Sequence, residues 1–279
     1  MTPELSAPVA PMGAPHPDNS GLFRYTVSLA DDALISAQRM GEWIASAPQL
    51  EEDVALGNIA LDLLGQARSL LSYAGQVEES SGGQASTAAR DEDALAYFRD
   101  EREFLNVQLV ERPYGHRGGD FAATVARLLI LSTYQMELYA RLRTSTDATL
   151  SAIAAKAMKE VDYHRDHATM WVLRLGDGTG ESRRKMQAGL DAEWAYHHEL
   201  FENSHIDPAL LEAGVAVDPG LLRGPWEERV CDVLAEATLT IPDVRCAVTG
   251  GRRGIHTEQM GYLLAEMQHL ARSHPGATW

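Results

Sequence analysis

The chain has 279 residues, 45% of them apolar and 23% charged, and a formal net charge of −16 at pH 7. This length and apolar content can supply a sizeable core in one large domain or two small ones. The acidic excess argues against nucleic acid and anionic membrane surfaces as partners, because both require clustered Lys and Arg, whereas a basic protein partner fits it.

The cysteine and proline content indicates the compartment. The two cysteines, Cys231 and Cys246, lack metal-ligand spacing and do not form a disulfide framework, so we expect reduced, inert and partly buried thiols. The sequence contains no run of about 18 apolar residues, so we expect no membrane span. Residues 1–22 are rich in proline and contain no apolar core of a signal peptide. We therefore expect a disordered Pro-rich tail over residues 1–22 and a cytoplasmic protein.

Residues 23–279 are predicted to form a single all-α domain, because apolar residues recur at helical spacing and no sustained strand-like alternation occurs. In chain order, long helices are predicted over residues 29–46, 50–74, 121–143, 147 or 151 to 175, and 181–201. Between the second and third come a Ser/Gly-rich linker (79–86), a short helix (92–99) and a short piece before Pro113. Two further helices are predicted near residues 226–235 and 257–273.

The helix ends have local signals. Pro48 stops the first helix, the acids after Leu50 suit the start of the second, and Asp120 is a predicted N-cap. The first four long helices, each about 27–37 Å long at 1.5 Å per residue, come in two pairs. Residues 75–119 supply a long crossover between the pairs. This arrangement predicts a ferritin-like four-helix bundle with additional C-terminal helices.

Bundles of this kind often hold two irons, which requires Glu-x-x-His on two helices and a Glu on each of the other two. The chain contains two Glu-x-x-His sequences, Glu202–His205 and Glu266–His269, and both fall outside the four long helices. We interpret them as chance matches. His197 and His198 are sequence neighbours and therefore form a poor chelate.

Polar residues do occur on the core helices, at spacings that place them on one helical face. The second helix has a row of Asn58, Asp62 and Gln66, and the fourth has Glu160 and His164. Glu137 on the third helix and His167 on the fourth are further candidates. These residues are compatible with a weak metal site, an interior hydrogen-bonded network or a solvated face. The lack of paired histidines on different core helices argues against metal.

The stretch Gly250–Gly254 (GGRRG) has two interpretations. It is compatible with an anion-binding turn, for which a CoA phosphate is a conceivable ligand. The interpretation we favour is a basic turn that leads into a helix with Thr257 as its N-cap.

Three longer stretches then identify a family. They lie within residues 40–74, 98–122 and 249–268, and include Asn58 to Arg68, Phe98 to Phe104 and His256 to Glu258; the chain ends in Trp279. From about residue 23 onward the sequence resembles the C subunits of bacterial phenylacetyl-CoA epoxidases. The Pro-rich tail and the Ser/Gly-rich linker lie outside the resemblance.

The resemblance implies a non-catalytic structural subunit of a multicomponent monooxygenase in aerobic phenylacetate catabolism. In that complex a di-iron sister subunit of the same fold epoxidises the ring of phenylacetyl-CoA with O2. NADPH supplies the electrons through a reductase that contains flavin and an iron–sulfur centre. The catalytic sister and the other epoxidase subunits are the implied partners, a homodimer of the isolated chain remains open, and no cofactor is expected in this subunit.

Against the sister's two Glu-x-x-His motifs, this sequence has Leu63 and Gln66 at the first and Val161 and His164 at the second. Asp32 and Glu137 are the nearest candidates for the other two carboxylates. We therefore predict no metal and no catalytic residue. The predicted interior polar network is Asn58, Asp62, Gln66, Glu137, Glu160 and His164, and the predicted partner contacts are His256, Thr257 and Glu258. The alternative is an active ferritin-like di-iron oxidase or metal-binding protein.

Overall fold

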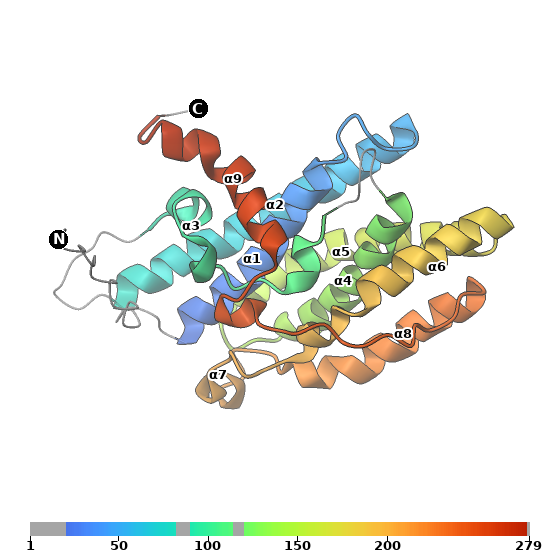
Figure 1. Cartoon of the computed structure of the whole chain (residues 1–279). Helices are drawn as coiled ribbons and strands as arrows, with labels where there is room; N and C mark the ends of the chain where they lie inside the picture. Colours follow the sequence, from blue (N-terminus) through green and yellow to red (C-terminus); the bar gives the residue numbers. More distant parts are fainter. Residues whose placement is uncertain (1–20, 82–89, 114–119, 278–279) are drawn as a thin grey trace, which may run out of the picture.

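The computed structural model describes residues 21–81, 90–113 and 120–277, and these residues fold into helices and loops without a strand. The four long helices are α1 (Gly21–Gly41), α2 (Leu50–Ser81), α4 (Phe121–Leu142) and α5 (Ala148–Gly176). α1 packs on α2, α4 packs on α5, and α2 lies beside α5 (Figure 1). The fold is all-α and ferritin-like, as the helix lengths predict.

The shorter elements surround this bundle. The connection from α2 to α4 contains α3 (Glu92–Tyr97) and the 3-10 turns η1 (Glu101–Glu103) and η2 (Gln108–Glu111). After α5 come α6 (Gly180–Trp194), η3 (His197–Phe201), α7 (Pro208–Glu212), η4 (Pro219–Leu222), α8 (Arg223–Glu236), η5 (Gly251–Arg253) and α9 (Glu258–Ser273). α6 and α8 pack on α4. α9 projects from the body beside α3 (Figure 1).

Helix caps follow the local sequence. The side chain of Asp120 accepts a hydrogen bond from the backbone N–H of Ala123 at 3.0 Å, as expected for an N-cap of α4. Asp147 caps α5 by accepting from two backbone N–H groups, and Thr179 caps α6. Of the two starts predicted for α5, the structure therefore selects Asp147.

Four predicted helix ends are wrong. α1 begins at Gly21 instead of residue 29, so two residues of the predicted tail are helical; residues 1–20 lie outside the described part. It ends at Gly41, before a turn in which Ala45 has a left-handed backbone (φ +64°). α2 continues to Ser81, where the ion pair between Glu78 and Arg90 supports its last turns.

The fourth wrong end is that of α6, which stops at Trp194 instead of residue 201. The carbonyl of Ala195 accepts from the backbone N–H of Ala247 at 2.8 Å, and Nδ1 of His197 lies 2.6 Å from the carbonyl of Trp194. Because these carbonyls have partners outside the helical ladder, the chain continues as η3.

Two buried tryptophans tie the outer elements to α4. The indole N–H of Trp43, in the turn after α1, donates to Oγ1 of Thr124 at 3.2 Å, and that of Trp226, on α8, donates to the carbonyl of Ile130 at 2.9 Å. Gly189 lets α6 approach closely, since a Cβ there would lie 2.6 Å from the backbone N of Ala123. α4 is therefore buried on most sides, as its apolar sequence requires.

None of the helices in the described part of the chain combines the length and the hydropathy that a membrane span requires. Both cysteines are free thiols: Cys231 is half-buried, whereas Cys246 is exposed, so the prediction of partial burial is wrong for Cys246. Burial raises the pKa of the Cys231 thiol, which disfavours the reactive thiolate.

Candidate functional site

The polar row of α2 meets α5 in two pairs, which we call the α2–α5 polar cluster (Asp62, Gln66, Glu160 and His164). Nε2 of His164 lies 3.2 Å from Oδ2 of Asp62. Nε2 of Gln66 donates to Oε2 of Glu160 at 3.0 Å, and the hydroxyl of Tyr139 donates to Oε1 of Gln66 at 3.2 Å. The cluster therefore joins α2, α4 and α5 through hydrogen bonds.

The other residues at the predicted site do not join this cluster. Asn58 is exposed on the outer side of α2, and Glu137 forms a partly exposed ion pair with Arg141 at 2.7 Å, so the structure does not place either in an interior network. Leu63 and Val161 are fully buried in the hydrophobic core. They fill space between the helices with apolar side chains.

Two imidazoles of α5 face carboxylates of α2. Burial lowers the pKa of His164, although the hydrogen bond and charge of Asp62 act in the opposite direction. Burial likewise lowers the pKa of His167, whose Nε2 lies 3.2 Å from Oε2 of Glu52. The same carboxylate oxygen accepts from the indole N–H of Trp171 at 2.8 Å. Both histidines are therefore neutral at pH 7 and engage one carboxylate each.

Two adjacent aspartates on α1 hold remote parts of the chain. Asp31 is fully buried and pairs with Arg99, and its Oδ2 accepts from the backbone N–H of Leu105 at 2.8 Å. Asp32 is buried and pairs with Arg252 of η5, at 2.7 Å between Oδ2 and Nη2 and 3.1 Å between Oδ1 and Nη1. α1 is thereby fixed to the connection before α4 and to the C-terminal segment.

The guanidinium of Arg252 has further partners inside the protein. Nη1 donates to the backbone carbonyls of Ser28 and Leu105, each at 2.9 Å. Burial raises the pKa of Asp32 to about 6, although the charge of Arg252 and the backbone N–H of Val107 lower it. At pH 7 the pair is therefore an ion pair with both charges removed from water.

The carboxylate of Glu111 in η2 holds the start of α9. Its Oε1 accepts from Nδ1 of His256 at 2.6 Å, and its Oε2 accepts from the backbone N–H and the hydroxyl of Thr257, each at 2.7 Å. Nε2 of His256 donates to the carbonyl of Phe104 at 3.0 Å. Burial acts to lower the pKa of His256, but the hydrogen bond and charge of Glu111 and the carbonyl of Phe104 outweigh it and raise the pKa.

Of the predicted partner contacts, His256 and Thr257 therefore have partners within the chain, whereas Glu258 is exposed. Thr257 precedes α9 as its N-cap residue, as predicted, but its hydroxyl donates to Glu111 and caps no helical N–H.

The Gly250–Gly254 turn binds an anion that belongs to the chain itself. The backbone N–H groups of Gly250 and Gly251 donate to Oε1 of Glu199 at 2.8 and 2.7 Å. Oε2 of Glu199 accepts from the backbone N–H of Gln108 at 2.7 Å. A Cβ on Gly251 would lie 2.0 Å from the carbonyl oxygen of Asn106, so only glycine fits. The interpretation as a CoA phosphate site is not supported, because these donors already have a buried carboxylate.

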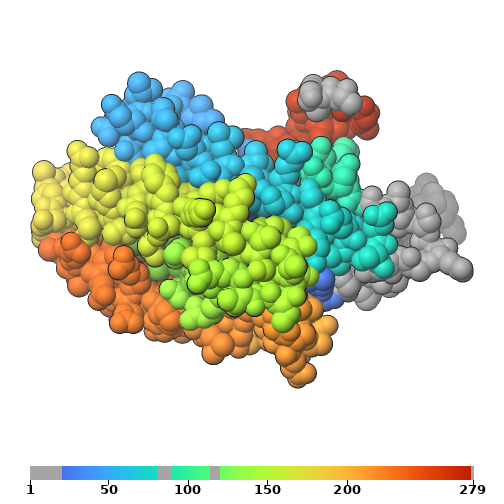
Figure 2. All heavy atoms as spheres, turned by 180° about the vertical axis from the view of Figure 1, so that it is seen from behind, coloured from blue at the N-terminus to red at the C-terminus, as the bar shows by residue number. Residues whose placement is uncertain are grey.

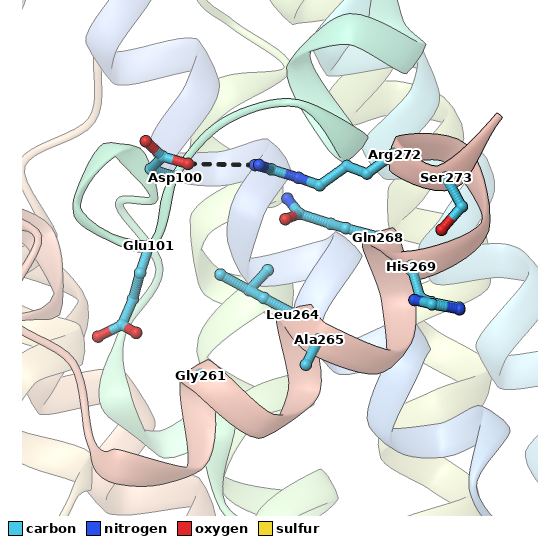
Figure 3. Close-up of a pocket in the computed structure, with 9 residues that line it drawn as sticks. All are labelled: Asp100, Glu101, Gly261, Leu264, Ala265, Gln268, His269, Arg272 and Ser273. Carbon is cyan, nitrogen blue, oxygen red and sulfur yellow. Dashed lines mark hydrogen bonds and ion pairs between the residues drawn. The ribbon is translucent and has the colours of Figure 1, made fainter. Parts of the chain in front are cut away.

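An open pocket of about 460 Å³ lies between α9 and η1 (Figure 3). Its polar side chains hold the two elements together: Arg272 pairs with Asp100 at 3.3 Å, and Nε2 of Gln268 donates to the carbonyl of Arg99 at 3.0 Å. His269 lines this pocket, but its Glu-x-x-His partner Glu266 does not.

The side chains do not fit a di-iron centre. In the described part of the chain, no three His, Cys, Asp or Glu side chains gather in a way that could hold a metal ion. Asp32 is held by a guanidinium, and the only imidazole at the motif positions is that of His164. Glu202 lies 3.8 Å from Arg253, and burial lowers the pKa of its motif partner His205 to about 3.

Sequence reasoning missed the residues that carry most of the buried charge. Examples are Arg99 with Asp31, Arg127 with Glu193, and Glu199 with the Gly250–Gly254 turn. Each pair joins residues at least 50 positions apart, so no local spacing indicates it. The only available signal was the double arginine in GGRRG, which marked a basic turn without indicating that Arg252 points inward.

Comparison with known proteins gives two matches. The family described as phenylacetic acid catabolic protein matches residues 10–279. The chain is also similar to the C subunit of the 1,2-phenylacetyl-CoA epoxidase of Escherichia coli strain K12. The two are 47% identical over 258 residues, which cover 92% of this chain and 99% of the relative. The similarity therefore spans the whole fold described above.

Proposed function

Because the chain belongs to the phenylacetic acid catabolic protein family, we propose that it is a subunit of a phenylacetyl-CoA epoxidase and has no catalytic centre of its own. In this proposal a sister subunit with a di-iron centre carries out the O2-dependent epoxidation, and a reductase with flavin and iron–sulfur centres delivers electrons from NADPH. The present chain supports the sister as a rigid helical partner.

The observation that carries the proposal is the state of the former ligand positions. Leu63 and Val161 are buried apolar residues, and Gln66 and His164 each bond to one neighbour on the opposite helix. A di-iron bundle needs four carboxylates and two imidazoles that converge on one point. Here the polar side chains bond to one another in pairs and do not converge on one point, which favours a structural role over redox chemistry.

The buried ion pairs support the same role. Arg99 and Arg252 fix α1 to distant segments, and Glu111 and Glu199 fix the turn before α9. Such links keep helix surfaces in a constant arrangement, which a partner surface requires. We further propose that the complex is cytoplasmic, which the free thiols fit.

The test is co-expression of this chain with the catalytic sister, followed by measurement of iron per polypeptide by mass spectrometry. We expect no stoichiometric iron in the isolated chain and a stable complex that contains iron. About two irons bound to the isolated chain would refute the proposal and indicate an active di-iron oxidase. Failure of the two chains to associate would refute the supporting role.

A further inference from the structure

The outer side of α2 carries a line of apolar residues that the described part of the chain does not cover. Leu50, Val54, Gly57, Leu61 and Leu64 follow one another at intervals of four, three, four and three residues, and we call them the outer row. Leu50 is 75% exposed, Leu61 66%, Val54 57% and Leu64 43%. Aliphatic side chains at this spacing form the seam of helix pairs, whereas a solvated helix face is normally polar.

The space above the row suits a helix in particular. A Cβ added at Gly57, in the middle of the row, would meet nothing within 4 Å, and the same holds at Gly65, one turn beyond Leu61. Glycine in a helix interior destabilises the helix, so the packing within the chain does not explain it. Small residues at these positions allow another backbone to approach closely. α2 and α5 lie side by side on this surface, and Figure 2 shows no helix over them.

The charges beside the row indicate the kind of partner. Glu51 and Asp53 flank its first turn, and Asp62, whose carboxylate also contacts the neutral His164, lies beside its last turns. The first cation of α2 is Arg68, four residues beyond Leu64, and Glu92 pairs with it at 3.3 Å. In a pair of helices, charges that flank the seam decide which partner binds. Two copies of this row would bring carboxylates against carboxylates, which disfavours a symmetric dimer through this face. A helix with Lys or Arg beside its apolar residues is complementary.

We propose that the outer row is the docking surface for an amphipathic helix of the catalytic sister subunit. The basic residues of that partner helix face Glu51, Asp53 and Asp62 of this chain. This inference rests on the proposed function, since it names the surface through which the support is given. The aliphatic side chains provide the buried contact, Gly57 sets the closest approach, and the carboxylates select a basic partner.

The test is the dissociation constant of the complex with purified catalytic sister, measured by biolayer interferometry on the full chain. Leu61→Glu is expected to raise the dissociation constant at least tenfold, because it would bury an unpaired carboxylate in the centre of an apolar seam. Leu221→Glu in η4 is the matched control, because Leu221 is also 66% exposed but lies away from α2, and it should bind as the wild type does. Circular dichroism establishes that both variants are folded.

Gly57→Gln provides a second variant that cannot act by unfolding, because its side chain enters open space and removes a helix-interior glycine. It should bind at least tenfold more weakly while its melting temperature is unchanged or higher. High salt should weaken the wild-type complex more than the E51Q/D53N complex.

A stable wild-type complex that Leu61→Glu and Gly57→Gln leave unchanged would overturn the docking surface and keep the proposed function. If instead the isolated chain is a dimer that Leu61→Glu converts to a monomer, the occupant is a second copy and the inference is wrong. No binding by the wild type would refute the proposed function itself.

Discussion

Replacing Arg252 by Met should strongly destabilise the protein. The change keeps much of the side-chain volume but removes the guanidinium that makes four hydrogen bonds to Asp32, Ser28 and Leu105. Asp32 then keeps only the backbone N–H of Val107 as a hydrogen-bond donor, at 2.9 Å. A carboxylate that is 4% exposed would lose its counter-ion.

The expected loss follows from the burial of the pair. Removal of one partner from a buried ion pair costs about 3–5 kcal/mol, a large part of the roughly 5–15 kcal/mol that stabilises a typical domain. Arg253→Met is the matched control, because the side chain of Arg253, the next residue, is 50% exposed and lies 3.8 Å from Glu202. The control should cost less than about 0.5 kcal/mol.

The dependence on pH identifies the cause. The pKa of Asp32 is raised from 3.8 to about 6 in the folded chain. The stability that its protonation contributes is thus fully present below about pH 4 and is lost as the pH rises through about 6. Loss of Arg252 should raise this pKa further, so the penalty of the variant should be larger at pH 7.5 than at pH 5.

Urea unfolding followed by circular dichroism at both pH values measures these differences. A penalty below about 1 kcal/mol, or an equal penalty at pH 5 and pH 7.5, would refute the assignment of Asp32 as a buried carboxylate that depends on Arg252.

Three further predictions concern stability. His256→Gln should cost about 1–3 kcal/mol of unfolding free energy near pH 6. Because the pKa of His256 is raised, the stability that the protonated ring contributes is fully present below about pH 6.5 and is lost as the pH rises through the folded pKa, so the cost of the substitution should shrink. Urea unfolding midpoints from pH 6 to 9 measure this change in cost. Ala45→Gly should stabilise by about 0.5–1 kcal/mol in thermal unfolding, since it relieves a left-handed alanine. Gly251→Ala should cost about 3 kcal/mol through its clash with the Asn106 carbonyl, whereas Gly57→Ala should stabilise by up to about 1 kcal/mol, and urea unfolding compares the two.

Each of these has an outcome that would contradict it. A pH-independent cost of His256→Gln would mean that the ring is neutral beside Glu111. Ala47→Gly, in the same turn but without a positive φ, is the control for Ala45→Gly, and equal effects would remove the strain argument. Equal stabilities of the two glycine variants would show that the close approach at Gly251 relaxes without cost.

The bundle could be predicted from the sequence because its signals are local. Apolar spacing indicates the long helices, and Asp120 and Asp147 cap them through contacts two or three residues away. The first turns of α1 could not be predicted this way. Residues 21–28 include Tyr25, Thr26 and Val27, which are poor helix formers, and their burial against the rest of the protein stabilises the helix instead.

The candidate site could be predicted only in part. The row of Asp62 and Gln66 and the histidine at 164 indicated residues that do meet between α2 and α5. Asn58 belongs to the same sequence row but lies on the surface, because an i, i+4, i+8 row turns gradually around a helix of 3.6 residues per turn. Glu137 pairs locally with Arg141.

Buried pairs that depend on the tertiary fold could not be predicted at all. Asp32 and Arg252 are separated by 220 positions, and a single sequence does not show that they meet. For the GGRRG stretch the favoured interpretation was a basic turn; the turn does bind an anion, but this is the Glu199 side chain of the same chain and not the CoA phosphate of the alternative interpretation.

The pairing of Asp32 with Arg252 also determines when, during synthesis, the buried ion pair can form. Asp32 leaves the ribosome 220 positions before Arg252, the cation that pairs with it. Until then the nascent bundle contains a carboxylate without its counter-ion, and a product that ends before residue 252 never acquires one. Chains that include Arg252 can therefore form the buried pair, whereas chains that terminate before it keep an unpaired buried carboxylate, which makes them less stable and more exposed to proteolysis.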